Sequence, residues 1–279
     1  MLVRLVKSLV FIVAATYLVA LTFLYVMQRR MMYYPCGEAP KSIQTRAQQD
    51  GFQGWTNHAG QLIGWHRPYK ASGPTLPLVF FHGNAGCAID RTGFADQLQK
   101  VAPLDVYLVE YPGFGGRRES PSQDALFAAA REAFEAVASK GKVYVAGESL
   151  GTGVASYIAG TFPSKTAGVL LMAPFNNMAA AARSHYPIIP VELVLKDTYR
   201  SDLFLKSYQG PLAVLLAAND EVVPSRLGQR LFNDYDGPKK IWVSETATHN
   251  TVGDLDDQKW REVIGFIGNP IVGQNSTTR

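Results

Sequence analysis

The fold is decided by the stretch VYVAGESLG, residues 143–151. Its first four residues are apolar and predict a short buried strand, and a helix rich in small residues is expected to begin at Leu150. Between them lies a Gly-x-Ser-x-Gly pattern in the strand, turn and helix context that it requires. The two glycines allow a sharp turn that lifts the Ser149 hydroxyl above the strand end. The N–H groups of the following helix favour a developing negative charge there, so Ser149 is a candidate nucleophile.

Short apolar strands alternate with helices along most of the chain. Strands are expected at 78–81, 106–109, 169–172, 212–216 and 241–243, and helices at 90–101, 122–138, 150–160, 224–235 and 256–267. Two aromatic-rich stretches, 51–57 and 61–67, predict a hairpin before them. The alternation indicates an α/β fold with a mostly parallel sheet flanked by helices. The insertion 175–209 interrupts it and has the size of a short cap over a pocket.

A nucleophilic serine needs a base, and the base needs an acid that orients it. After a turn of this kind the acid comes next in the chain and the histidine last, and only His185 and His249 follow Ser149. His249 is preferred because it lies just after the last expected strand, whereas His185 lies in the cap insertion. The acid is expected to end the preceding strand. Asp220 is preferred there to its neighbour Glu221, because the shorter side chain suits the tighter turn.

Two backbone N–H groups are expected to form an oxyanion hole, which stabilises the charge that develops on the substrate oxygen. One belongs to Leu150, the residue after the candidate nucleophile. The other is expected at Asn84, in the glycine-rich stretch 81–86 that follows an early strand. His82 in this stretch is interpreted as a hydrogen-bonded structural residue. Phe114, which follows a Pro-Gly turn, is expected either to line the pocket or to pack in the core.

Five motifs stand in order along the chain, namely HGNAG (82–86), YPGFG (111–115), GESLG (147–151), NDEVVP (219–224) and HN (249–250). Together they resemble the membrane-anchored α/β-hydrolase-domain proteins, which are related to prolyl-oligopeptidase-like and serine-aminopeptidase-like hydrolases. The resemblance covers roughly residues 25–268. It implies an α/β-hydrolase fold, a catalytic triad of Ser149, Asp220 and His249, and hydrolysis of an ester, thioester or lipid. Cys87 departs from the family's pattern, in which a polar residue is expected, and the cysteine-rich N-terminus of the family's depalmitoylases is absent.

The N-terminal stretch 8–28 contains no charged side chain. At about 1.5 Å per residue it spans about 30 Å, the thickness of a bilayer's hydrocarbon core. The alternative is a cleaved signal peptide, but its apolar region is shorter, about 7–15 residues, and bulky residues follow Ala20 here. We therefore expect an uncleaved transmembrane anchor at 1–30. Lys and Arg flank both ends almost equally, so the side of the membrane stays open.

The expected organisation is a transmembrane anchor at 1–30, a polar neck at 31–50, a hydrolase domain at 51–268 with its cap at 175–209, and a flexible tail at 269–279. The chain contains only two cysteines, Cys36 and Cys87. Both are expected to be free thiols. A disulfide between them remains the alternative if the domain faces an oxidising compartment.

The net charge of +4 comes entirely from the first 50 residues, since residues 51–279 hold 21 basic and 21 acidic side chains. This balance argues against a nucleic-acid partner. No phosphate loop, dinucleotide fingerprint or metal-ligand spacing occurs in the sequence, so no cofactor and no metal are expected.

The leading hypothesis is a serine hydrolase that cleaves an acyl ester or thioester through an acyl-enzyme intermediate, with a small acyl-ester or lipid-like substrate. An amidase or peptidase on the same triad and a non-catalytic membrane scaffold are the alternatives. The short cap predicts a preference for short-to-medium acyl chains. The oligomeric state stays open.

Overall fold

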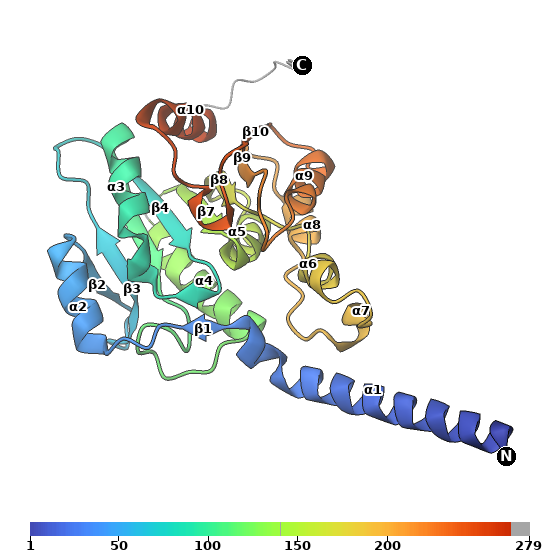
Figure 1. The fold of residues 1–279 in the computed structure, drawn as a ribbon. Helices are drawn as coiled ribbons and strands as arrows, with labels where there is room; N and C mark the ends of the chain where they lie inside the picture. Colours follow the sequence, from blue (N-terminus) through green and yellow to red (C-terminus); the bar gives the residue numbers. More distant parts are fainter. Residues whose placement is uncertain (140, 269–279) are drawn as a thin grey trace.

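An eight-stranded sheet forms the centre of the computed structural model, which describes residues 1–139 and 141–268 (Figure 1). In order across the sheet, the strands are β10 (Lys239–Ser244), β9 (Leu212–Ala217), β8 (Thr166–Met172), β7 (Val143–Glu148), β4 (Leu76–Phe81), β6 (Leu104–Val109), β3 (Leu62–Arg67) and β2 (Gln53–Thr56). From β10 to β6 all neighbours are parallel, and β3 and β2 complete the sheet as an antiparallel hairpin. The mostly parallel sheet predicted from the sequence is confirmed. The flexible tail expected at 269–279 lies outside the described residues.

Both faces of the sheet are covered by helices. One face carries α4 (Gln123–Ala138), α5 (Leu150–Thr161) and α9 (Ser225–Asp234), and the other carries α3 (Thr92–Val101) and α10 (Asp257–Gly268). Side chains alternate between the two layers along β4, where Val79 and Phe81 enter one core and Leu78 and Phe80 enter the other. All four are buried. A strand buried on both faces has no polar side, which explains its continuous apolar run.

The insertion between β8 and β9 contains three short helices. These are α6 (Met178–His185), α7 (Val191–Val194) and α8 (Ser201–Phe204), followed by a 3₁₀ turn at Leu205–Ser207. The α8 helix packs against α5, whereas α6 and α7 lie on the side of the domain toward the N-terminal helix (Figure 1). We use the name cap for residues 178–195, which include α6 and α7.

The N-terminal helix α1 (Leu2–Met32) projects from the domain (Figure 1). By length and composition it could cross a membrane, and none of its apolar stretch is buried inside the protein. Its last turns nevertheless contact the domain, because the guanidinium of Arg29 pairs with the carboxylate of Asp197 at 2.9 Å. The helix is therefore attached to the domain through side chains as well as through the chain itself.

The expectation of a polar neck at 31–50 is wrong, because this segment is packed onto the domain. Strand β1 (Tyr34–Pro35) pairs with β5 (Ala85–Gly86), which belongs to the loop after β4. Helix α2 (Pro40–Gln49) buries Ile43 and Ala47 completely. These two residues are four positions apart and share one face of α2, a signal that its many polar side chains obscured.

The two cysteines form a disulfide between Cys36 and Cys87, so the expectation of free thiols is wrong. Their Cα atoms lie 5.6 Å apart, within the usual range for a disulfide. The bond joins the segment after α1 to the loop after β4. The sequence separation of 51 residues gave no indication of this contact, which arises because β1 pairs with β5.

Candidate active site

Ser149 occupies the turn between β7 and α5, at the carboxyl edge of the sheet. Its φ of 49° lies in the left-handed region, so the turn is strained as a Gly-x-Ser-x-Gly turn should be. A Cβ added to Gly147 would lie 2.3 Å from the carbonyl oxygen of Gly151. One added to Gly151 would lie 2.0 Å from the carbonyl oxygen of Phe81. Both glycines are therefore required by close backbone approach.

The structure brings the three predicted residues together. Nε2 of His249 lies 2.9 Å from Oγ of Ser149, and its Nδ1 lies 3.0 and 2.8 Å from the two carboxylate oxygens of Asp220. The three residues follow β7, β9 and β10, which are parallel strands whose carboxyl ends lie at one edge of the sheet. The side chain of Asp220 is 1% exposed and that of His249 is 12% exposed. The arrangement can pass a proton from the serine to an imidazole that a buried carboxylate orients.

The geometry of the turn after β9 favours Asp220 over Glu221 as the candidate acid. Oδ1 of Asp220 accepts hydrogen bonds from the amides of Val222 and Val223, at 2.9 and 2.7 Å. These bonds hold the carboxylate toward His249, whereas Glu221 is exposed. His185 was the other candidate base. Its Nε2 donates a hydrogen bond to the carbonyl of Val222 at 2.8 Å. That histidine therefore ties the cap to the turn and does not contact the serine hydroxyl.

The loop after β4 holds Asn84 beside Ser149. Asn84, Ser149 and Leu150 line one cavity, so the two residues of the expected oxyanion hole lie next to the candidate nucleophile. The carbonyl of Asn84 accepts a hydrogen bond from the amide of Tyr34 at 2.8 Å, and its side-chain amide donates to the carbonyl of Met32 at 2.9 Å. The chain leaving α1 therefore fixes the position of the Asn84 loop. Nothing in the local sequence around Asn84 indicated this support.

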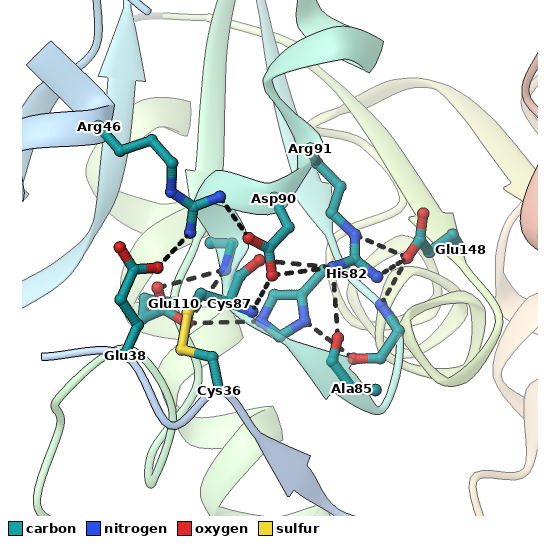
Figure 2. Close-up of polar contacts among 12 residues, drawn as sticks. Cys36, Glu38, Arg46, His82, Ala85, Cys87, Asp90, Arg91, Glu110 and Glu148 are labelled. Atoms are coloured by element: carbon teal, nitrogen blue, oxygen red, sulfur yellow. Dashed lines mark hydrogen bonds and ion pairs between the residues drawn. A yellow bond between two sulfur atoms is a disulfide. The ribbon is translucent and has the colours of Figure 1, made fainter. Parts of the chain in front are cut away.

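A salt bridge behind the turn was also missed from the sequence (Figure 2). Oε1 of Glu148 accepts hydrogen bonds from Nε of Arg91 at 2.8 Å and from the amide of Gly83 at 3.2 Å. Arg91 also donates to the carbonyl of Ala85 at 3.2 Å. The Arg91–Glu148 pair thus connects the turn that carries Ser149 to the loop after β4 that carries Asn84. One signal in the sequence could have indicated this pair. Glu148 is a charged residue at the end of a buried strand, and a charge in such a place needs an oppositely charged partner.

Asp90 connects this loop to α2 (Figure 2). Its carboxylate accepts a hydrogen bond from the amide of Cys87 at 2.7 Å and one from Arg46 at 2.6 Å. Burial raises the pKa of Asp90, but the Cys87 amide and the Arg46 guanidinium together outweigh it and hold the pKa below its ordinary value. The carboxylate is therefore ionised at neutral pH, which keeps both bonds charge-assisted.

His82 is enclosed in the core beneath the loop. Its Nδ1 donates to the carbonyl of Gly83 at 2.8 Å, and its ring packs against the ring of Tyr111 with centroids 4.2 Å apart. Nε2 lies 3.6 Å from a carboxylate oxygen of Glu110. These contacts agree with the structural interpretation of His82. Phe114 is also fully buried and belongs to the core, so the packing alternative for this residue is the correct one.

Two cavities meet at the serine hydroxyl. The first, of about 540 Å³ and called the polar cavity below, is lined by apolar residues such as Phe94 and Met172 and by the polar residues Asp90, Arg91, Gln97, Glu148, Asn250 and Asp254. The second, of about 270 Å³, is mainly apolar and is lined by residues of the cap, of the sheet edge and of α1. Ser149, Asn84 and Val222 belong to both. Such a site suits a substrate whose polar and apolar parts join at the reacting carbonyl. Within residues 1–139 and 141–268, no group of three or more His, Cys, Asp or Glu side chains could hold a metal ion.

Comparison with known proteins gives four informative similarities. The model of the alpha/beta hydrolase family matches residues 78–272. An uncharacterized protein of Mycobacterium tuberculosis (strain CDC 1551 / Oshkosh) is 32% identical over 262 residues, which cover 91% of this chain and 92% of that protein. The lysophosphatidylserine lipase ABHD12 of Mus musculus is 29% identical over 202 residues, which cover 64% of this chain but only 50% of that protein. Among solved structures, an alpha-beta hydrolase from Vibrio vulnificus superposes with a TM-score of 0.64 at 18% identity, over 84% of this chain and 88% of that one.

Proposed function

The chain belongs to the alpha/beta hydrolase family, and we propose that it is a serine hydrolase that cleaves an acyl ester or thioester. The observation that carries this proposal is the chain of hydrogen-bond distances of 2.8–3.0 Å from Ser149 through His249 to Asp220. A nucleophile, a general base and a buried orienting acid are the parts that acyl transfer requires.

In the first half-reaction, Oγ of Ser149 attacks the substrate's carbonyl carbon while Nε2 of His249 takes the hydroxyl proton. The amides of Leu150 and Asn84 stabilise the oxyanion of the tetrahedral intermediate. As the intermediate collapses, His249 returns the proton to the leaving alcohol or thiol, and the acyl group stays on the serine. In the second half-reaction His249 takes a proton from water, whose oxygen attacks the carbonyl carbon of the acyl-enzyme. As this intermediate collapses, His249 returns the proton to Oγ of Ser149, the acyl–oxygen bond to the serine breaks, and the acid is released. Asp220 stabilises the imidazolium in both halves.

The two cavities support an amphipathic substrate. The apolar cavity accommodates the acyl chain, and the polar cavity accommodates the leaving group, which is water-soluble or attached to a polar head group. A relative that is named as a lysophosphatidylserine lipase supports a lipid ester of this kind. We therefore propose that the substrate is a membrane lipid or a related compound with one acyl ester at the boundary between its polar and apolar parts.

The test compares an ester with its matched amide. The purified full-length chain should hydrolyse p-nitrophenyl butyrate and the corresponding thioester, and a fluorophosphonate probe should abolish both activities by labelling Ser149. The matched anilide should turn over much more slowly, because the leaving amine is poorer. A single-acyl phospholipid should slow the labelling by competition. Absence of both hydrolysis and labelling would identify a non-catalytic protein, and faster turnover of the anilide would identify an amidase.

We also propose that α1 is an uncleaved single-span anchor. It is long and apolar enough to span a bilayer, and its last turns are built into the domain through the Arg29–Asp197 ion pair. A signal sequence that is removed has no need of such contacts. The anchor would keep the domain at the membrane, where acyl lipids are concentrated.

The disulfide supports a position of the domain outside the reducing cytosol. Disulfides persist in oxidising compartments, and Cys36 lies only four residues beyond the end of α1. We expect a thiol-reactive polyethylene glycol maleimide, added to denatured protein from intact cells, to shift its mass only after reduction. The Cys36→Ser variant is the control, since its single remaining thiol should react without reductant. Reaction of both thiols in unreduced wild type would place the domain in a reducing compartment.

A further inference from the structure

The apolar cavity runs from Ser149 to the side of the N-terminal helix. Its walls come from three parts of the chain, the sheet edge, the cap and α1, represented by Leu150, Phe175, Met178, Ile189, Leu24 and Met31. Leu24 is half-buried although most of α1 is exposed. Without α1, the cavity would therefore be open along one side.

Polar side chains of α1 bind the backbone of the cap. The hydroxyl of Tyr17 donates to the carbonyl of Ile188 at 2.7 Å. The side-chain amide of Gln28 donates to the carbonyl of Val194 at 3.0 Å, and it accepts from the amide of Lys196, the residue directly after the cap, at 2.8 Å. A hydroxyl and an amide within an apolar helix need such partners, because lipid offers none. The contacts extend over 11 residues of α1, a distance of about 16 Å along the helix axis.

The end of α1 is also fixed by a buried acid. Two nitrogens of Arg29 donate to the two carboxylate oxygens of Asp197, each at 2.9 Å. The hydroxyl of Tyr33 donates to the same carboxylate at 3.0 Å and lies 2.8 Å from the hydroxyl of Tyr199. The side chain of Asp197 is only 2% exposed, so separating it from Arg29 would leave an unpaired buried charge. The helix therefore keeps a defined position beside the cap.

These contacts place the cap beside the apolar stretch of α1. Tyr17 lies within residues 8–28, and the cap loop that contacts it carries Ile188. Ile188 is 79% exposed and Leu193 is 85% exposed. Large apolar side chains that are so exposed on a short segment are typical of a surface that meets lipid.

We propose that α1 is a wall of the acyl-binding cavity and that the acyl chain of a membrane lipid enters this cavity directly from the bilayer, between α1 and the cap. The inference rests on the proposed hydrolysis at Ser149 and assigns a role in substrate binding to the anchor. The ester carbonyl then reaches Ser149 at the junction of the two cavities, with its polar leaving group on the aqueous side. The substrate's acyl chain stays in apolar surroundings throughout.

This arrangement changes what the cap implies about acyl length. A preference for short-to-medium chains followed from the small size of the cap alone. Because α1 supplies the opposite wall and the cavity faces the bilayer, the end of a long chain can remain among the lipids while its carbonyl reaches the serine. Long-chain substrates are therefore expected to bind.

The test uses two fluorophosphonate probes, one with a methyl and one with a hexadecyl chain, on the full-length chain in lipid nanodiscs. Both probes lose fluoride as Oγ of Ser149 bonds to phosphorus, but only the long chain needs the apolar cavity. Leu24→Trp places a larger side chain in that cavity and should lower the ratio of hexadecyl to methyl labelling rates by about tenfold. Val26→Trp is the matched control, because Val26 is 66% exposed on α1 and does not line the cavity, and it should leave the ratio unchanged.

The outcomes separate this inference from the proposed function. If neither probe labels the wild-type chain, the hydrolase proposal and the cavity proposal both fail. If both probes label it and Leu24→Trp leaves the ratio at the wild-type value, the anchor is no part of the acyl site and the hydrolase proposal stands. An equal fall in Val26→Trp would likewise overturn the inference, since the effect would then come from the anchor as a whole. A loss confined to the long probe in Leu24→Trp supports it.

Discussion

Ser149→Ala is expected to lower the kcat for hydrolysis of a p-nitrophenyl ester by about 10⁴–10⁶-fold, because the attacking oxygen is lost and the remaining groups act only as a unit. Oγ of Ser149 is the atom that lies 2.9 Å from Nε2 of His249. His249→Ala should be as severe for the same reason. The rates are measured with the full-length chain at substrate concentrations around KM, and labelling by a fluorophosphonate probe should vanish in Ser149→Ala.

This prediction has two controls, a second serine variant and a measurement of folding. Ser207→Ala removes an exposed hydroxyl from the 3₁₀ turn before β9 and should retain wild-type activity and labelling. The circular dichroism spectrum of Ser149→Ala should match the wild type, because the backbone amide and carbonyl of residue 149 keep their bonds to Met172 and Thr152. A loss of only a few-fold in kcat with an unchanged spectrum would show that another residue is the nucleophile.

The core of the candidate site was predictable because its signals are local. Three signals are each visible within a few residues: the apolar run that ends at Ala146, the two glycines around Ser149, and the position of His249 after the last strand. The residues that follow different parallel strands then lie close together, since the carboxyl ends of these strands are at one edge of the sheet. The preference for Asp220 over Glu221 was also local, since it rested on the shorter side chain in the tight turn after the strand.

The supports of the site could not be predicted because they are contacts between distant segments. The Cys36–Cys87 bond depends on a pairing of only two residues in each of β1 and β5, which leaves no periodic pattern in the sequence. The Arg91–Glu148 pair joins a helix start to the serine turn, 57 positions away. The contact of α1 with the cap could not be predicted, because a charge-free stretch of this length already indicates a transmembrane helix and requires no contact with the domain. Tyr17 and Gln28 gave a weak signal, since each carries a polar group that lipid cannot satisfy.

Asp220→Asn is expected to lower kcat by about 10⁴-fold, with little effect on folding. An asparagine can keep its carbonyl oxygen toward the amides of Val222 and Val223, so the turn after β9 should persist. Its side-chain amide cannot stabilise an imidazolium, and it favours the histidine tautomer whose Nε2 carries a proton and cannot accept one from Ser149.

Glu221→Gln is the matched control, because it makes the same change of charge one residue away on an exposed side chain. It should stay within about twofold of the wild-type kcat/KM, as exposed substitutions away from a site usually do. Both variants are compared by kcat/KM for the ester and by thermal unfolding, so that a loss of stability is not mistaken for a loss of chemistry. If Glu221→Gln proved the damaging change and Asp220→Asn were harmless, the carboxylate that lies 2.8 Å from His249 would not be the one that orients it during turnover.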